Sequence, residues 1–136
     1  MYELFEHTAD VGLRMRASSR EELFADAARA LVSLLVAEPE SVQPRSHRQF
    51  RVLGDELEYL LFDWLSELLY SIETDGWLWS RFEIQIDTEG LTADCWGEPI
   101  DRQRHHLEHE VKAITYHGLF VRQEAERWQA EVVVDI

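Results

Sequence analysis

The chain has 136 residues, of which 46% are hydrophobic and 11% aromatic, enough to fill one compact core. Its 13 Lys and Arg against 27 Asp and Glu give a net charge of −14. That charge argues against direct binding of a phosphate backbone, because nucleic-acid-binding surfaces are basic. We therefore expect one domain that meets a basic partner or gathers cations, and that contacts any nucleic acid through its partner.

Compartment and membrane contact follow from simple features of the chain. The single cysteine, Cys95, cannot form an internal disulfide, and the opening MYELFEHTAD has neither a basic start nor a long apolar stretch. The longest apolar run, residues 59–65, is broken by Asp63 and is much shorter than the ~20 residues of a membrane helix. The sequence predicts a cytoplasmic protein without a membrane span.

The N-terminal half predicts strands and two amphipathic helices. The expected elements, in chain order, are strands at 2–6 and 13–17, a helix at 20–36, a strand at 50–52 and a helix at 54–76. Ser19 and Glu22 form a capping box before the first helix, whose apolar residues recur at helical spacing. The second helix has a broad apolar stripe and ends at Gly76, a left-handed cap.

In the C-terminal half the hydrophobic period changes to two residues, which is typical of strands. The expected strands are 82–86, 91–95, 111–121 and 128–136, with turns at 88–90 and 124–126. Two helices among roughly seven strands, mostly joined by hairpins, indicate an α+β fold. We expect the helices to pack on one side of a mainly antiparallel or mixed sheet.

The first candidate for chemistry is the segment HTADVG at residues 7–12, which lies where two expected strands meet and would place Asp10 at a turn. One interpretation is structural: Asp10 forms an Asx-type turn and Gly12 supplies an unusual backbone angle. The other makes Asp10 the third ligand of a metal site at the C-terminal residues. That second interpretation requires the fold to bring the two places together.

The second candidate is the C-terminal VVVDI, residues 132–136. Alternation turns Asp135 away from the core face that Val134 and Ile136 occupy, and the terminal carboxylate of Ile136 stands beside the Asp135 side chain. Ligands that are all oxygen suit hard cations such as Ca²⁺, Mg²⁺ or Mn²⁺, whereas softer metals bind sulfur or imidazole.

The third candidate is EVKAITYH, residues 110–117, predicted as a strand with Lys112, Ile114 and Tyr116 on one face. A lysine held near carboxylates orients a phosphate or balances the charge of a metal site. A lysine on an edge strand discourages aggregation instead. The residues alone favour the edge interpretation.

Two further groups of polar residues are expected to be solvated. His105, His106 and His109 have neither an HExxH pattern nor a nearby cysteine, so zinc binding is not favoured. Asp63 and Glu67 share the polar side of the second helix, where like charges cost ~0.2–0.5 kcal/mol, which favours a solvated or partner-facing surface over an acid/base pair. The sequence contains no nucleophile elbow, phosphate-binding glycine loop or triad pattern.

Six segments together resemble the archease family and occur in its order: EHTADVG at 6–12, DWLSELLY at 63–70, SRFE at 80–83, GEPID at 97–101, EVKAITYH at 110–117 and VVVDI at 132–136. The resemblance implies one sandwich-like α+β domain over residues 1–136. It also implies a partner, the RtcB-type RNA ligase, which uses GTP and Mn²⁺ to join ends bearing a 3′-phosphate or 2′,3′-cyclic phosphate to a 5′-hydroxyl end. Archeases promote guanylylation of that ligase and support its multiple turnover.

Carried over to this chain, the family's metal site falls on Asp10, Asp135 and an oxygen of Ile136, and its essential lysine on Lys112. The resemblance therefore implies a divalent cation, Ca²⁺ first and Mg²⁺ or Mn²⁺ as alternatives. It implies an activator in tRNA splicing and RNA repair rather than an enzyme, with RNA contacted mainly through the ligase. Alternative functions are a free-standing metal-dependent phosphoester hydrolase and a general chaperone-like binding module.

Overall fold

The computed structural model describes residues 1–7 and 10–136, and side chains for residues 1–6 and 10–136. The elements are β1 (Tyr2–His7), β2 (Asp10–Ala17), α1 (Arg20–Leu35), the 3-10 turn η1 (Pro39–Ser41), β3 (Ser46–Leu53), α2 (Leu57–Glu73), β4 (Trp77–Ile86), β5 (Gly90–Pro99), β6 (Ala113–Ile114), β7 (Phe120–Glu124) and β8 (Arg127–Asp135). The predicted α+β class and its two helices are confirmed.

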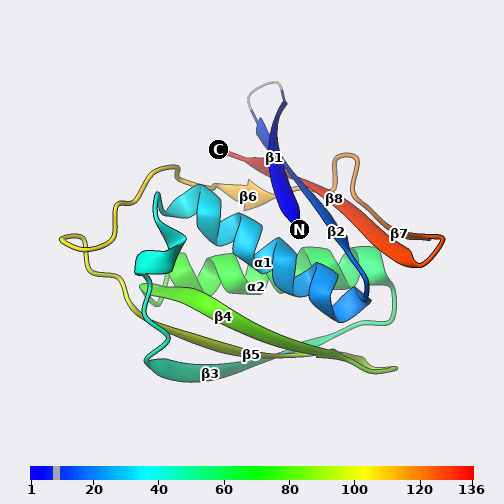
Figure 1. Cartoon of the computed structure of the whole chain (residues 1–136), viewed down its shortest axis with the longest axis horizontal. Helices are drawn as coiled ribbons and strands as arrows, with labels where there is room; N and C mark the ends of the chain where they lie inside the picture. The colour runs from blue at the N-terminus through cyan, green and yellow to red at the C-terminus, as the bar shows by residue number, and fades with distance from the viewer. Residues whose placement is uncertain (8–9) are drawn as a thin grey trace.

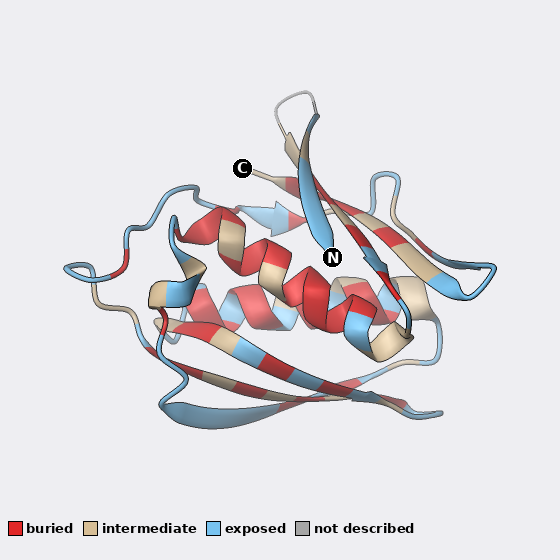
Figure 2. Ribbon diagram, viewed as in Figure 1, coloured by how far each residue is buried: buried red, intermediate tan, exposed pale blue. Residues whose placement is uncertain are grey.

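The helices form a layer between two antiparallel sheets (Figure 1). One sheet has the order β1-β2-β8-β6, with β7 also paired to β8, and the other has the order β3-β5-β4. Both helices contact strands of both sheets. The expectation that they cover one side of one sheet was wrong, because α1 buries eleven of its sixteen residues and so has apolar contacts on two sides. Figure 2 shows this burial along α1 and the alternation of buried and exposed residues on the strands.

The helix ends agree with the predicted signals. The Ser19 hydroxyl accepts a hydrogen bond from the Glu22 backbone N–H at 3.1 Å, which fixes the first turn of α1. Helix α2 begins at Leu57, slightly later than expected, and is followed by Gly76 at φ 73°, the left-handed conformation that glycine adopts most easily.

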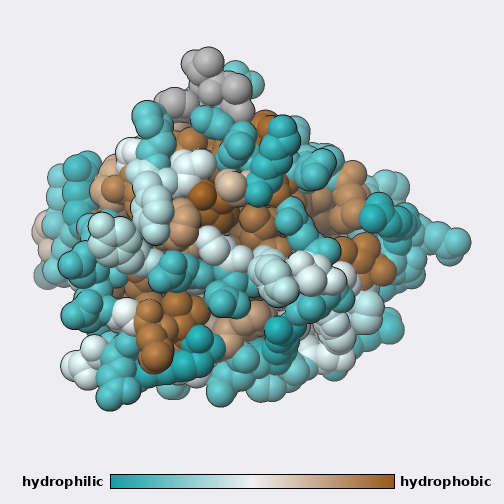
Figure 3. All heavy atoms as spheres, turned by 180° about the vertical axis from the view of Figure 1, so that it is seen from behind, coloured by the Kyte–Doolittle hydropathy of each residue, from teal (hydrophilic) through white to brown (hydrophobic). Residues whose placement is uncertain are grey.

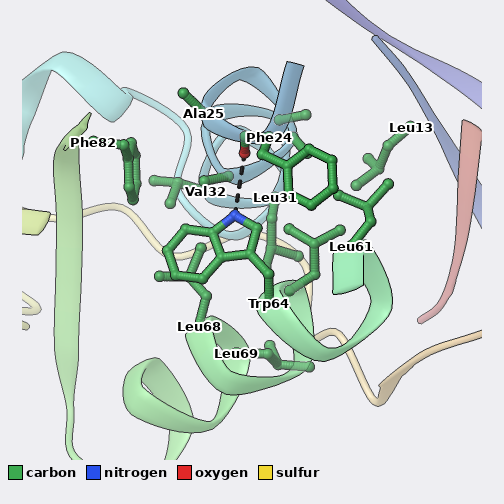
Figure 4. Close-up of a cluster of buried hydrophobic side chains, with 14 of the residues drawn as sticks. Leu13, Phe24, Ala25, Leu31, Val32, Leu61, Trp64, Leu68, Leu69 and Phe82 are labelled. Carbon is green, nitrogen blue, oxygen red and sulfur yellow. Dashed lines mark hydrogen bonds between the residues drawn. The ribbon is translucent and has the colours of Figure 1, made fainter. Parts of the chain in front are cut away.

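Trp64 of α2 joins the layers of the core (Figure 4). Its ring is fully buried, and its indole N–H donates to the carbonyl of Phe24 in α1 at 3.1 Å. Phe50 of β3 and Phe82 of β4 meet the same ring edge-on, with centroids at 5.8 and 6.4 Å. One side chain therefore connects both helices to the three-stranded sheet.

The predicted continuous strand over 111–121 was wrong in its middle. Ala113 and Ile114 pair with Asp135 and Val134, but Phe120, rather than His117, pairs with Glu131, so the chain inserts three extra residues between β6 and β7. A turn with Gly118 at φ 65° closes this excursion. The predicted turns before β5 and before β8 are confirmed.

The surface contains both hydrophilic and hydrophobic residues. Seen from behind Figure 1, hydrophobic atoms lie in separate patches among hydrophilic ones (Figure 3). Among the described residues, no helix is long and apolar enough to cross a membrane.

Candidate functional site

The fold brings the two ends of the chain together at one pair of carboxylates. Asp10 is the first residue of β2 and lies directly opposite Asp135 of β8. Residues opposite each other in an antiparallel pair place their Cβ atoms about 4.5–5.5 Å apart and point to the same face. Because Leu13 and Val134 are buried against the helices, alternation puts both aspartates on the outer face, where each is partly buried.

This arrangement corrects the turn assigned to Asp10. The residue pairs with His7 of β1 and with Asp135 of β8, so it belongs to the ladder. Of the segment 7–12 between the two expected strands, residues 8 and 9 lie outside the described residues. The predicted direction of Asp135, away from the core face of Val134, is confirmed by their opposite places in the alternation.

Lys112 lies next to Asp135 on the side of β8 that faces β6, whereas Asp10 lies on the side that faces β2. Its backbone N–H donates to the Asp135 carbonyl at 2.7 Å, and the next residue, Ala113, lies opposite Asp135 in the ladder. Lys112 is exposed whereas Ile114 is buried, so the prediction that they share a face was wrong. The reason is that Lys112 precedes the two-residue strand β6 and does not follow its alternation.

Lys112 is also the chain's one lysine, since the other twelve basic side chains are arginines. Lysine carries a compact, strongly hydrated ammonium, whereas arginine carries a planar fork. Among the basic side chains, only that of Lys112 could therefore bring a compact ammonium to this place, where its backbone is bonded to Asp135.

Gly12, two residues after Asp10, is needed for a close contact rather than for an unusual backbone angle. A Cβ atom on Gly12 would collide with the ring of Phe5, which lies opposite it on β1. The guanidinium of Arg14 lies 4.5 Å from the centre of the Phe5 ring and donates to Glu3 and Glu131 at 3.0 Å each. The sequence pattern did not reveal this packing, because it placed Phe5 in a strand and Gly12 in the turn segment that follows it.

An open pocket of about 640 Å³ borders the carboxylate site. Asp10 and Ile136 lie on its lining, and the other lining residues are Leu4, Phe5, Glu6, Val11, Leu34 and His109. The side of the sheet end next to the aspartates is therefore hollow and accessible to a partner's side chain or to water.

The donor set fits a hard cation. Both side chains supply carboxylate oxygens, and Ca²⁺ binds six to eight oxygen ligands. Within the described part of the chain no group of three or more His, Cys, Asp or Glu side chains is arranged to hold a metal. A cation at Asp10 and Asp135 would therefore take further oxygens from Ile136, from water or from a partner.

His105 corrects the expectation that the three histidines of residues 105–109 are all solvated. It is buried, and its Nε2 lies 3.0 Å from Glu98 while its Nδ1 accepts from the Asp101 backbone N–H at 2.9 Å. Glu98 also accepts from Arg104 at 2.5 Å and from the Gln43 backbone N–H at 2.7 Å. Spacing in the sequence gave no sign of this network, because it depends on burial of the loop after β5.

The network makes a pH-dependent contribution to stability. Burial alone would raise the pKa of Glu98, but the hydrogen bonds from Arg104, Gln43 and His105 outweigh it and lower the pKa from 4.5 to about 2. A lowered pKa stabilises the folded chain above pH 4.5, and this contribution is lost as the pH falls toward 2.

We therefore expect the Glu98→Gln variant to be less stable than the parent near neutral pH, with a difference that shrinks on acidification. Urea unfolding of both proteins between about pH 6 and about pH 2 measures that difference. A stability difference that stays constant over the whole range would contradict the role of the ionised carboxylate.

The remaining polar candidates are exposed, as expected. His106 and His109 are exposed, and so are Asp63 and Glu67 on α2. Asp63 and Glu67 line a separate open pocket together with Arg51, which agrees with a solvated or partner-facing surface.

The fold and the site define a small α+β protein in which a helix layer lies between two antiparallel sheets and a carboxylate pair closes one end of the larger sheet. The profile described as the archease protein family (MTH1598/TM1083) matches residues 2–136. The chain belongs to the archease family.

Individual archeases are similar to this protein along nearly its whole length. The protein archease of Methanopyrus kandleri is 39% identical over 142 residues, covering 99% of both chains. The protein archease of Pyrococcus abyssi is 39% identical over 140 residues, covering 99% of this chain and 98% of its own. The solution structure of Methanobacterium thermoautotrophicum protein 1598 superposes with a TM-score of 0.87 at 32% identity, covering 99% of this chain and 98% of that one.

Proposed function

We propose that the protein is a cation-binding activator of an RtcB-type RNA ligase, and that it acts in tRNA splicing and RNA repair in the cytoplasm. Asp10, Asp135 and an oxygen of Ile136 would hold a divalent cation, Ca²⁺ first and Mg²⁺ or Mn²⁺ as alternatives. The observation that carries the proposal is the placement of Asp10 opposite Asp135, with the backbone of Lys112 bonded to the Asp135 carbonyl.

Electrostatics support a cation at this place. Like charges directly opposite each other on adjacent strands are destabilising, and a divalent cation between them offsets that repulsion. When bound, such a cation supplies positive charge that neutralises phosphate and orients reacting groups. The chain's own aspartates would fix the cation at the sheet end, where the neighbouring pocket leaves room for the partner.

The position and charge of Lys112 support a role in a phosphate-transfer reaction that takes place on the partner. Its exposed ammonium lies on the segment bonded to Asp135, and a compact positive charge suits a phosphate oxygen. The net charge of −14 favours docking on a basic protein surface over direct binding of RNA. We therefore assign guanylyl transfer to the ligase and its activation to this chain.

We expect the Asp10→Asn and Asp135→Asn variants to weaken Ca²⁺ or Mn²⁺ binding. Loss of a group that hydrogen-bonds to a metal ligand lowers metal affinity by about 10–100-fold, and loss of a ligand itself should lower it further. Isothermal titration calorimetry measures the change. Asp63→Asn is the matched control, because it removes an exposed carboxylate from α2 and should leave the affinity unaltered.

The cation-free proteins provide a second readout. Asp135→Asn removes one of two opposed charges, so it should raise the free energy of unfolding by ~0.2–1 kcal/mol when no divalent cation is present. If Asp135→Asn keeps the parent's cation affinity while folding normally, the proposed ligand set is wrong.

A further inference from the structure

Three aromatic rings meet where the excursion between β6 and β7 lies on α2. The ring of Tyr116 stacks on Phe62 with centroids 3.9 Å apart and planes at 10°, and meets Tyr59 at 5.8 Å and 72°. Tyr59 and Phe62 are three residues apart on α2 and so are neighbours on its surface. Tyr59 and Tyr116 are each 54% exposed, so two tyrosine rings at a steep angle face solvent together.

The two tyrosines line an open pocket of about 590 Å³ with Leu119, Glu56 and Glu58. The Glu58 carboxylate accepts a long hydrogen bond of 3.5 Å from the backbone N–H of Val121, which places it beside β7, just after the excursion. In the part of the chain that the structure describes, neither Glu56 nor Glu58 forms an ion pair. The pocket therefore combines aromatic walls with two carboxylates whose negative charge no ion pair among the described residues neutralises.

This combination selects a particular ligand chemistry. Aromatic faces are negative, so they attract a cation above the ring, and the carboxylates add charge of the same sign. A bare metal ion would require oxygen ligands on more sides than a pocket with aromatic walls offers. A phosphate backbone would be repelled by both glutamates.

We propose that this pocket binds an arginine side chain presented by a basic protein partner. A planar guanidinium stacks on one tyrosine ring while its N–H groups reach a carboxylate, and its aliphatic stem covers Leu119. The net charge of −14 favours a basic partner in general, and this pocket gives the contact a defined place. The pocket offers the same contact whether or not that partner is the ligase.

Two small probes of equal size test the proposal by NMR. N-acetyl-arginine methylamide carries the guanidinium, and N-acetyl-citrulline methylamide replaces it with an uncharged urea. We expect the arginine probe to shift the ring signals of Tyr59 and Tyr116 in a saturable way at low salt, and the citrulline probe to leave them nearly unmoved.

Variants locate the binding. Tyr59→Leu and Glu58→Gln should each weaken the arginine probe by roughly two- to fivefold, with amide spectra that show a native fold. Tyr70→Leu is the control, because Tyr70 is 61% exposed on the same helix but outside the pocket, and it should bind as the parent does. Equal shifts with both probes, no saturable shift, or an equal loss in Tyr70→Leu would each overturn the proposal.

Discussion

Replacing Lys112 with alanine should abolish most of the activation of an RtcB-type ligase while leaving the melting temperature close to the parent's. The side chain is exposed, and exposed substitutions usually change stability by no more than ~0.5 kcal/mol. Its ammonium is placed on the segment bonded to Asp135, where we propose that it acts on the partner's reacting phosphate. The measurement is the amount of guanylylated ligase formed with limiting amounts of each variant.

Two further variants separate charge from geometry. Lys112→Arg keeps the positive charge but replaces a compact ammonium with a planar fork, so rescue by arginine would indicate that charge alone suffices. Arg127→Ala removes an exposed cation from the other end of β8 and should activate normally. The proposed role fails if Lys112→Ala stimulates guanylylation as well as the parent, or if its loss of activation follows unfolding.

Replacing Trp64 with alanine should lower the free energy of unfolding by about 3–5 kcal/mol, the range for deleting a large aromatic side chain from a core. The indole is fully buried, bonds to the Phe24 carbonyl and contacts Phe50 and Phe82. Small domains are stable by only about 5–15 kcal/mol, so the variant should unfold at a much lower urea concentration. Circular dichroism during urea unfolding measures the change without relying on tryptophan fluorescence.

Two controls test whether the effect belongs to this position. Trp64→Phe keeps much of the ring but loses the indole N–H, so it should be intermediate. Tyr70→Ala removes an exposed ring from the same helix and should stay within ~0.5 kcal/mol of the parent. A Trp64→Ala protein as stable as Tyr70→Ala would contradict the central place of Trp64 in the core.

The helices were predictable because their signals are local. The Ser19 cap and the apolar spacing after it predicted α1 within one residue, and the broad stripe of α2 and its terminal Gly76 predicted the second helix. The layering was not predictable in the same way, since periodicity tells which face of an element is apolar but not what covers it. Apolar residues around most of α1 were the available signal for two sheets.

In the carboxylate site, too, the local features were predictable and the contacts between distant residues were not. Alternation correctly turned Asp135 from the core face, but its partner depends on the register between β2 and β8, which spacing along the chain does not contain. The archease resemblance, rather than periodicity, joined Asp10 to Asp135. Tyr116 shows the converse: a period of two predicted an unbroken strand, whereas stacking on Phe62 accompanies an excursion of the chain onto α2.

Incubation of the purified protein with GTP and RNA ends bearing a 2′,3′-cyclic phosphate, with and without an RtcB-type ligase, tests the central claim most directly. We expect guanylylated ligase and joined RNA to increase only when the ligase is present, and the increase to be lost with Asp135→Asn and Lys112→Ala. Hydrolysis of phosphate esters by the protein alone, or a ligase that gains nothing from its addition, would contradict the assignment as an activator.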